Sequence, residues 1–276
     1  MKSKLSGFAA PYVVWMAVFV VIPILIMVMY AFTTEEFAAT LEHFTGMGDY
    51  VAVFTRSFYL AVIATAVCFL IGYPMAYAMA KEGPRFQRAA MALIMLPMWM
   101  NFLLRTYSWM SILENNGLIN QFLRLVGLVG PEEHIQLIGT SGAVVLGMVY
   151  NYLPFMILPI YSVIVKLDGS LLEAARDLGA GSATVFRRVI FPLSLPGILS
   201  GVTMVFVPSV STFAISRLLG GGTQMMLGDL IEQQFLGGAY NPHLGAAIAM
   251  VMMVVVVVCM AVMNAFGEGE EEAIML

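Results

Sequence analysis

The stretch KLDGSLLEAARDLGAGSATVFRRVIFPLSLPG, residues 166–197, is a polar segment in a chain that is otherwise strongly apolar. The spacing of Ser170 and Glu173 predicts a capping box at the start of a short helix. That helix is predicted to run through Leu178 and to end at Gly179, because glycine adopts the left-handed conformation at little cost. Ser182 is expected to cap a second short helix. Two short helices are therefore predicted between long apolar runs.

The first of these helices has small and apolar side chains on one face. They are Leu171, Ala174, Ala175 and Leu178. One interpretation is a helix that lies on the membrane surface, with Arg187 and Arg188 near lipid phosphates. Alanine side chains offer little apolar area to lipid, whereas they let another protein surface approach closely. The sequence therefore favours a helix that docks in a protein groove and passes on motion.

The composition indicates that much of the chain lies in the apolar interior of a membrane. The chain has 276 residues, of which 61% are hydrophobic and 11% charged, against about 25% charged in soluble domains. A membrane core of ~30 Å needs ~20 apolar residues in a helix, and six runs approach or exceed this length. They are Pro11–Phe32, Ser57–Ala80, Ala89–Leu104 (continuing through Arg105), Ser141–Val165, Leu193–Ser216 and Leu244–Phe266. We expect an all-α membrane protein with six transmembrane helices in a single domain, residues 1–276.

The orientation follows from the basic residues, which concentrate on the cytoplasmic side of membrane proteins. Nine of the 13 lysines and arginines fall on one side of the predicted spans. They are Lys2, Lys4, Lys81, Arg85, Arg88, Lys166, Arg176, Arg187 and Arg188. Both termini and the stretch 166–197 are therefore predicted to be cytoplasmic. The N-terminal run is too long for a cleaved signal peptide.

Several kinds of chemistry have no matching pattern in the sequence. A phosphate-binding P-loop needs Gly-x4-Gly-Lys-Ser/Thr, and none of the four lysines fits it. Nothing resembles a catalytic pair, and no metal site is expected from the separated cysteines and histidines. The six apolar runs contain no Asp or Glu, which disfavours a self-contained ion-coupled carrier. We expect a transport subunit that is not an enzyme, binds no cofactor and is powered by another protein.

The opening stretch resembles the EAA loop of ABC-importer permeases. That motif reads EAA-x3-G-x9-I-x-L-P, and Glu173, Gly179 and Pro192 match it here, while Val189 and Phe191 replace Ile and Leu conservatively. The resemblance implies the ABC type I importer permease fold, with the coupling loop at about 166–195 between spans four and five. It implies that a partner ATPase uses ATP and Mg. The implied ATPase-coupling residues are Glu173, Ala174, Ala175, Arg176, Asp177, Leu178 and Gly179.

Three further stretches, 96–109, 153–180 and 220–235, are similar to the PotB-type permeases of spermidine/putrescine importers. This implies a bacterial plasma-membrane complex with a second, PotC-like permease, two copies of an ABC ATPase and an extracytoplasmic polyamine-binding protein. Lipid is an expected partner and nucleic acid is not. Related permeases transport anions, metal ions or other amines, so these substrates stay open. The Glu-rich C-terminal tail departs from the basic end that the family suggests.

A polyamine path would need acidic groups and aromatic faces. The candidates are Trp99, Tyr107, Trp109, Glu114 and Tyr152 around spans three and four, Ser209 and Thr212 in span five, and Asp229 in an outer loop. Aromatic belts at the membrane surface and hydroxyl packing between helices are the alternative readings. Arg105 is expected to reach the outer interface or to hold a carboxylate such as Glu114.

Overall fold

The computed structural model describes residues 11–130 and 132–274, with 264 and 266–274 described by backbone alone. Its regular elements in this range are helices, apart from one β-bridge between Thr33 and Ala39. In chain order they are η1 (Ala17–Val21), α2 (Ile22–Ala31), α3 (Glu42–Thr45), η2 (Gly46–Tyr50), α4 (Val51–Lys81), α5 (Pro84–Met95), η3 (Leu96–Trp99), α6 (Phe102–Leu113), α7 (Leu118–Leu125), α8 (Ser141–Ile164), α9 (Gly169–Asp177), α10 (Ser182–Val185), η4 (Phe186–Ile190), α11 (Phe191–Leu193), α12 (Leu195–Ser211), α13 (Ala214–Leu219), α14 (Leu227–Leu236) and α15 (Pro242–Ile274). The predicted all-α class is confirmed.

Four described helices are long and apolar enough to cross a membrane: Pro11–Ala31, Glu42–Lys81, Ser141–Ile164 and Pro242–Met263. Two bent pairs of helices bring the number to six if each pair is one span. They are Pro84–Trp99 with Phe102–Leu125, and Ser182–Leu193 with Leu195–Ser211. The predicted spans three and five correspond to these bent pairs.

The third span does not continue straight through Arg105 as the sequence suggested. Its two halves meet at an angle of 89°. Asn101 begins the second half as an N-cap, since its Oδ1 accepts hydrogen bonds from the amides of Leu103 (2.8 Å) and Leu104 (3.3 Å). Pro97 precedes the break in a short 3₁₀ turn. A capping side chain inside an apolar run starts a new helix in a new direction.

The fifth span is also shorter than predicted. Helix α12 ends at Ser211, and Thr212 has an extended backbone (φ −64°, ψ 139°) before α13 begins at Ala214. At its other end, α12 meets the segment Ser182–Leu193 at 61°. Within the predicted run from Leu193 to Ser216, α12 and α13 are therefore separated by Thr212 and Phe213.

The described chain divides into two compact units, and the prediction of a single domain stays a prediction. One unit is the chain up to Ala52 together with Leu230–Val257, and the other is Val53–Asp229 together with the chain from Val258. In the first unit, buried Ala31 packs with Ala246 and Ala247. The ring of His243 stacks on Tyr30, with centroids 4.9 Å apart.

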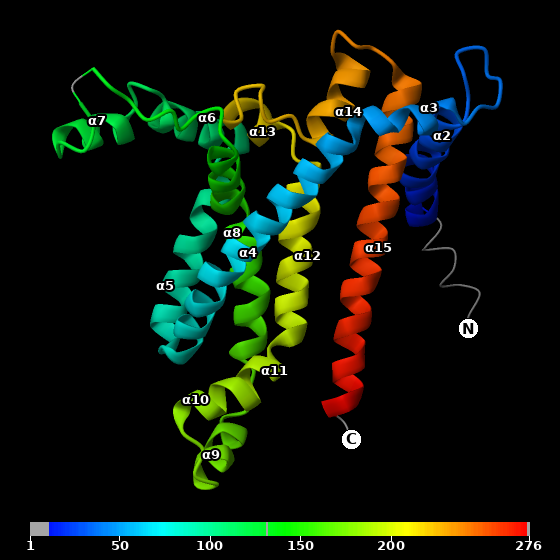
Figure 1. Ribbon diagram of the computed structural model, residues 1–276. Coiled ribbons are helices and arrows are strands. Elements are labelled where there is room, and N and C mark those ends of the chain that lie inside the picture. The colour runs from blue at the N-terminus through cyan, green and yellow to red at the C-terminus, as the bar shows by residue number, and fades with distance from the viewer. Residues whose placement is uncertain (1–10, 131, 275–276) are drawn as a thin grey trace, which may run out of the picture. The chain divides into compact units, whose positions relative to one another are not determined.

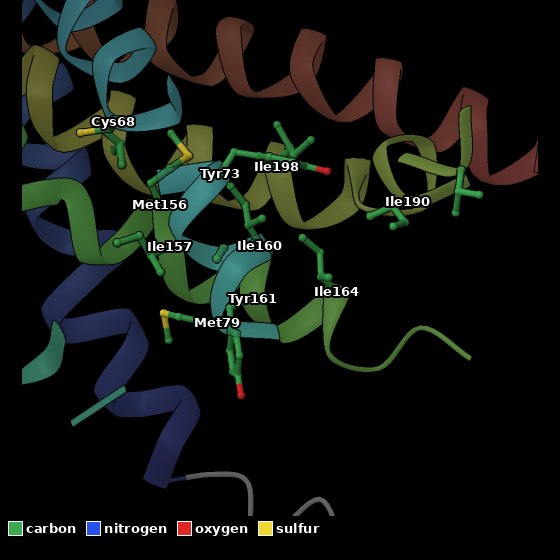
Figure 2. Close-up of a cluster of buried hydrophobic side chains, with 13 residues drawn as sticks. Cys68, Tyr73, Met79, Met156, Ile157, Ile160, Tyr161, Ile164, Ile190 and Ile198 are labelled. Carbon is green, nitrogen blue, oxygen red and sulfur yellow. The ribbon is translucent and has the colours of Figure 1, made fainter. Parts of the chain in front are cut away.

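The second unit is built around α4, α8 and α12. Its main cluster of buried side chains comes mainly from these helices and includes Tyr73, Met156, Ile160 and Ile198 (Figure 2). Helices α9 and α10 lie at one end of α8 and α12, while α6, α7 and α13 lie at the other (Figure 1). Because the cluster also contains Val185 and Ile190, it joins the predicted coupling loop to the bundle.

Close approach of α8 and α12 depends on Gly201. A Cβ atom at this position would lie 2.9 Å from Sδ and 3.1 Å from the backbone oxygen of Met156 on α8. Met156 is fully buried. In a membrane, helices associate largely through such close packing, because lipid gives little hydrophobic drive between them. The α8–α12 contact therefore requires the absence of a side chain at residue 201.

We predict that Gly201→Ala destabilises the chain by about 1–3 kcal/mol, the usual range for overpacking. The backbone oxygen of Met156 cannot rotate away, so α8 and α12 must separate. The thermal unfolding midpoint in detergent measures the effect. Gly46→Ala is the control, since nothing lies within 4 Å of a Cβ atom there. An unchanged midpoint for Gly201→Ala would contradict the proposed packing.

Candidate functional site

Helix α9 begins with a different cap from the one predicted. Asp168 is the N-cap, and its Oδ1 accepts a hydrogen bond from the amide of Ser170 at 2.9 Å. Hydrogen bonds from the backbone and the side chain of Ser170 hold the pKa of Asp168 below its usual value. The capping box of Ser170 and Glu173 was wrong, because Ser170 already lies inside the first turn. The helix consequently starts at Gly169, earlier than a cap at Ser170 would give.

The other end of α9 is closed by Gly179, as predicted, although the helix itself ends at Asp177 and Leu178 is its C-cap. Gly179 has a φ of +81°. Its amide donates to the carbonyl of Arg176 (2.8 Å), and the amide of Ala180 donates to the carbonyl of Ala175 (3.1 Å). These two bonds form a Schellman motif. The glycine of the EAA loop therefore has a local structural role.

The two faces of α9 have different surroundings. Leu172 and Ala175 pack against the buried cluster of the second unit. Leu171 is 50% exposed, Leu178 is 90% exposed, and Ala174 is also exposed. We call Leu171, Ala174 and Leu178 the exposed α9 face. The sequence placed Ala174 and Ala175 together on one docking face, whereas the structure turns Ala175 toward its own chain and leaves Ala174 outside.

The segment after Gly179 is tied to the bundle by aromatic and hydroxyl contacts. Gly181, without a side-chain cap, precedes α10, so the predicted capping by Ser182 was wrong. The ring of Phe186 packs edge-on against Tyr73 and Tyr77 of α4, with centroids 5.8 and 5.2 Å apart. The hydroxyl of Tyr73 lies 3.0 Å from that of buried Ser194. The coupling loop is therefore joined to α4 as well as to α8 and α12.

Tyr73, Ser194 and Leu172 are the residues of this site that sequence reasoning missed. Leu172 lies three residues before Ala175, so helical spacing could have indicated that both point inward. Tyr73 is far away in the sequence, and no local pattern relates it to Ser194. The remaining coupling candidates, Glu173, Arg176 and Asp177, are exposed on α9.

The structure separates the aromatic path candidates. Trp109 lies edge-on to Tyr150, with ring centroids 5.4 Å apart. Trp99 is 85% exposed, and Tyr107 is 47% exposed on α6. Glu114 is exposed at the C-terminal end of α6. Trp109 and Tyr150 thus form a defined pair, and Trp99 stands apart from it.

Arg105 occupies the same aromatic region and is buried, with only 8% of its surface exposed. Its guanidinium carbon lies 5.9 Å from the centre of the Tyr150 ring. Within the described residues, it makes no ion pair with Glu114, and its Nε and Nη1 have no hydrogen-bond partner. The expected bond to Glu114 is therefore not formed in the described part of the chain, while the expected position at the outer interface stays a prediction. The cation–π contact explains part of its position.

The candidates of span five lie inside the helix packing. Ser209 is fully buried, and its hydroxyl donates to the carbonyl of Val205 at 2.7 Å. Tyr152 makes a side-chain hydrogen bond with Thr212, and its hydroxyl also lies 3.5 Å from the carbonyl of Pro208. Tyr152 and Thr212 are therefore brought together where α12 ends.

Asp229 does not lie in an open loop, as the sequence suggested. It is 6% exposed, in the first turn of α14, and its Oδ2 accepts a hydrogen bond from the amide of Met226 at 2.9 Å. The next amide, of Leu227, donates to the hydroxyl of Ser57 on α4 at 2.8 Å. The carboxylate thus stabilises the start of α14.

Comparisons with known proteins agree with this architecture. The chain is 40% identical over 230 residues to the spermidine/putrescine transport system permease protein PotB of Haemophilus influenzae, covering 80% of each chain. It is 37% identical over 249 residues to PotB of Escherichia coli, covering 87% of this chain and 90% of that one.

The fold is similar to that of a solved bacterial ABC transporter involved in the import of the acidic polysaccharide alginate. The TM-score is 0.81 at 16% sequence identity, over 96% of this chain and 95% of that one. The MetNI methionine ABC transporter also matches, with a TM-score of 0.57 at 19% identity over 83% of this chain and 97% of that one. The importer-permease fold expected from the EAA stretch is confirmed.

A family model described as the binding-protein-dependent transport system inner membrane component matches residues 69–268. The match covers well over half of the chain and includes α9 and the helices on which it packs. Together with the relatives above, it shows that the chain belongs to this family of inner-membrane permease components of ABC importers.

Proposed function

We propose that this chain is the permease subunit that moves polyamines, spermidine or putrescine, across the inner membrane in an ATP-driven importer. The relatives at 37–40% identity over most of the chain are named for transport of these compounds. As a permease component, the chain works with an ATPase that is a separate subunit and with a binding protein. We infer that a second, PotC-like permease completes the path, above two copies of the ATPase and below an extracytoplasmic polyamine-binding protein.

The observation that supports coupling best is the division of α9 into two faces. The exposed α9 face offers the ATPase two leucine side chains separated by a small residue. On the opposite face, Leu172 and Ala175 pack on the cluster that α4, α8 and α12 share. A helix of nine residues is too short to be stable by itself. Its position is therefore set by the buried cluster and by the ATPase that contact it. Displacement of α9 by the ATPase would therefore be passed to all three helices.

For the substrate path, the geometry favours the inner aromatic pair over the exposed tryptophan. Trp109 of α6 lies against Tyr150 of α8, and Tyr152 bonds to Thr212 at the end of α12. Aromatic faces and hydroxyl oxygens both suit ammonium groups. Trp99, with most of its ring exposed, fits the aromatic belt of a membrane surface better. We assign Trp109, Tyr152 and Thr212 to the path.

We predict that Ala174→Phe leaves the chain inserted in the membrane but weakens retention of the ATPase by roughly 5- to 150-fold. A bulky ring on the exposed α9 face would hold the two proteins apart, and overpacking of a close contact costs ~1–3 kcal/mol. Retention of the co-expressed ATPase on washed membranes measures the effect, together with polyamine uptake. Ala89→Phe, at an exposed alanine of α5, is the matched control.

Ala175→Phe should behave differently, since it enlarges a side chain that packs on the buried cluster. We expect it to lower the unfolding midpoint of the chain itself. Normal ATPase retention and normal uptake in the Ala174→Phe protein would contradict the proposed docking face. An effect equal to that of Ala89→Phe would point to a general response to added apolar bulk.

We predict that Gly179→Ala destabilises the end of α9 by about 1–2 kcal/mol, the cost of a left-handed conformation for a residue with a side chain. The glycine has open space around it, so the effect comes from the backbone and not from a clash. We expect the assembled complex to take up less polyamine for each ATP hydrolysed. Parallel measurement of the two rates checks this. Gly169→Ala, which also has open space but an ordinary φ, should be close to neutral.

We predict that Trp109→Ala raises the polyamine concentration for half-maximal uptake by roughly 2- to 30-fold, the range of a cation–π contact. Trp99→Ala should change it little. Uptake of labelled spermidine by cells that contain the whole importer gives both values, with membrane levels of the chain measured alongside. Equal values for the two variants would remove Trp109 from the proposed path.

A further inference from the structure

A polar cavity of about 320 Å³ lies beside the second part of the coupling loop. Its lining residues are Ala183, Thr184, Arg187 and Arg188. The volume is at the lower end of the ~300–1,000 Å³ range of small-molecule pockets. The cavity is separate from the exposed α9 face and from the aromatic pair of the proposed path, and it has no part in the coupling described above.

The backbone that holds the two arginines is held firmly from its other side. Residues Phe186–Ile190 form a π-helical turn, a feature often found at functional sites. Val185 and Ile190, at either end of it, are 3% and 5% exposed. Phe186 is packed against Tyr73 and Tyr77. The turn is therefore anchored by its apolar side chains, while Arg187 and Arg188 remain exposed.

The chemistry of the lining selects an anion. Within the described part of the chain, neither Arg187 nor Arg188 forms an ion pair or a side-chain hydrogen bond. The hydroxyl of Thr184, also in the lining, adds a further donor. Guanidinium groups keep their charge at all ordinary pH values and match the oxygens of phosphate in a forked geometry. Two adjacent guanidiniums and a hydroxyl are a donor set that suits a phosphate group.

We propose that this cavity binds the phosphate of an anionic phospholipid in the cytoplasmic leaflet. The arginines lie only seven and eight residues before α12 begins at Leu195, so they are about 10–12 Å along a helix from the membrane-crossing part. They belong to the predicted cytoplasmic set of basic residues, and that membrane surface is negatively charged. The inference depends on the permease family and not on the identity of the substrate.

Such a lipid would give the coupling loop a fixed end. The π-helical turn follows α9 and precedes α12, so a headgroup held there would restrain the start of span five at the membrane surface. Movement of α9 would then rotate the loop about the π-helical turn. The turn itself would stay at the membrane surface. The bound lipid would act as a positioning group for ATPase coupling.

The test uses the complete importer in nanodiscs of phosphatidylcholine, with or without phosphatidylglycerol. Native mass spectrometry counts retained phosphatidylglycerol, and the ATP hydrolysis rate is measured on the same samples. We expect Arg187→Gln with Arg188→Gln to weaken retention about 30-fold, at roughly fivefold for each basic residue at an anionic surface, and to abolish the response of hydrolysis to this lipid. Arg187→Lys with Arg188→Lys should fall between, because charge is kept and the fork is lost.

The matched control is Arg85→Gln with Arg88→Gln, which removes the same charge from exposed arginines of α5 outside the cavity. The proposal is supported if this control keeps its lipid, and it is overturned if both pairs lose it equally.

Inorganic phosphate, added to pure phosphatidylcholine discs, tests whether the cavity binds a free anion and not a lipid headgroup. If it reproduces the lipid response, the lipid assignment fails. The last variant combines Glu268→Gln, Glu270→Gln, Glu271→Gln and Glu272→Gln. If the unaltered importer retains no phosphatidylglycerol and this variant does, the acidic tail occupies the cavity and the proposal is overturned.

Discussion

The close contact of α8 with α12 at Met156 and Gly201 is the constraint on which the rest of the second unit depends. Met156 fills the space that a side chain at residue 201 would need. Because these two helices touch at the level of the backbone, their ends are held in a fixed relation. The segment between those ends is the coupling loop. A loop of short helices, none stable by itself, is thereby given a rigid support.

That support explains how a polar stretch functions in an apolar chain. The loop sends Leu172 and Ala175 of α9 into the cluster and ties itself to α4 through Phe186 and Tyr73. Polar and charged groups remain on the outside, where a cytoplasmic partner and a membrane surface are available. The apolar segments of the sequence therefore form the supporting bundle of α4, α8 and α12. The polar segment forms the loop, whose outer side is the contact surface.

Prediction from sequence patterns succeeded where one segment determines its own structure. Apolar length predicted the spans, and the EAA pattern with Gly179 predicted a helix end that the φ of +81° confirms. It failed where two competing local residues were available, as when Asp168 capped α9 in place of Ser170. It also failed where distant residues decide. Arg105 lies over Tyr150 of another helix, and no spacing along the chain relates the two. The aromatic pair of Trp109 and Tyr150 has the same origin.

The Schellman closure of α9 also limits how the loop can change in evolution. The amide of Ala180 must reach the carbonyl of Ala175, so the number of residues between the alanine pair and Gly179 is fixed by hydrogen-bond geometry. Substitutions in this interval alter only side chains. An inserted or deleted residue would rotate one part of the helix by about 100° relative to the closing turn, and Leu171 and Ala174 would face elsewhere. Length is thus more strictly constrained here than residue identity.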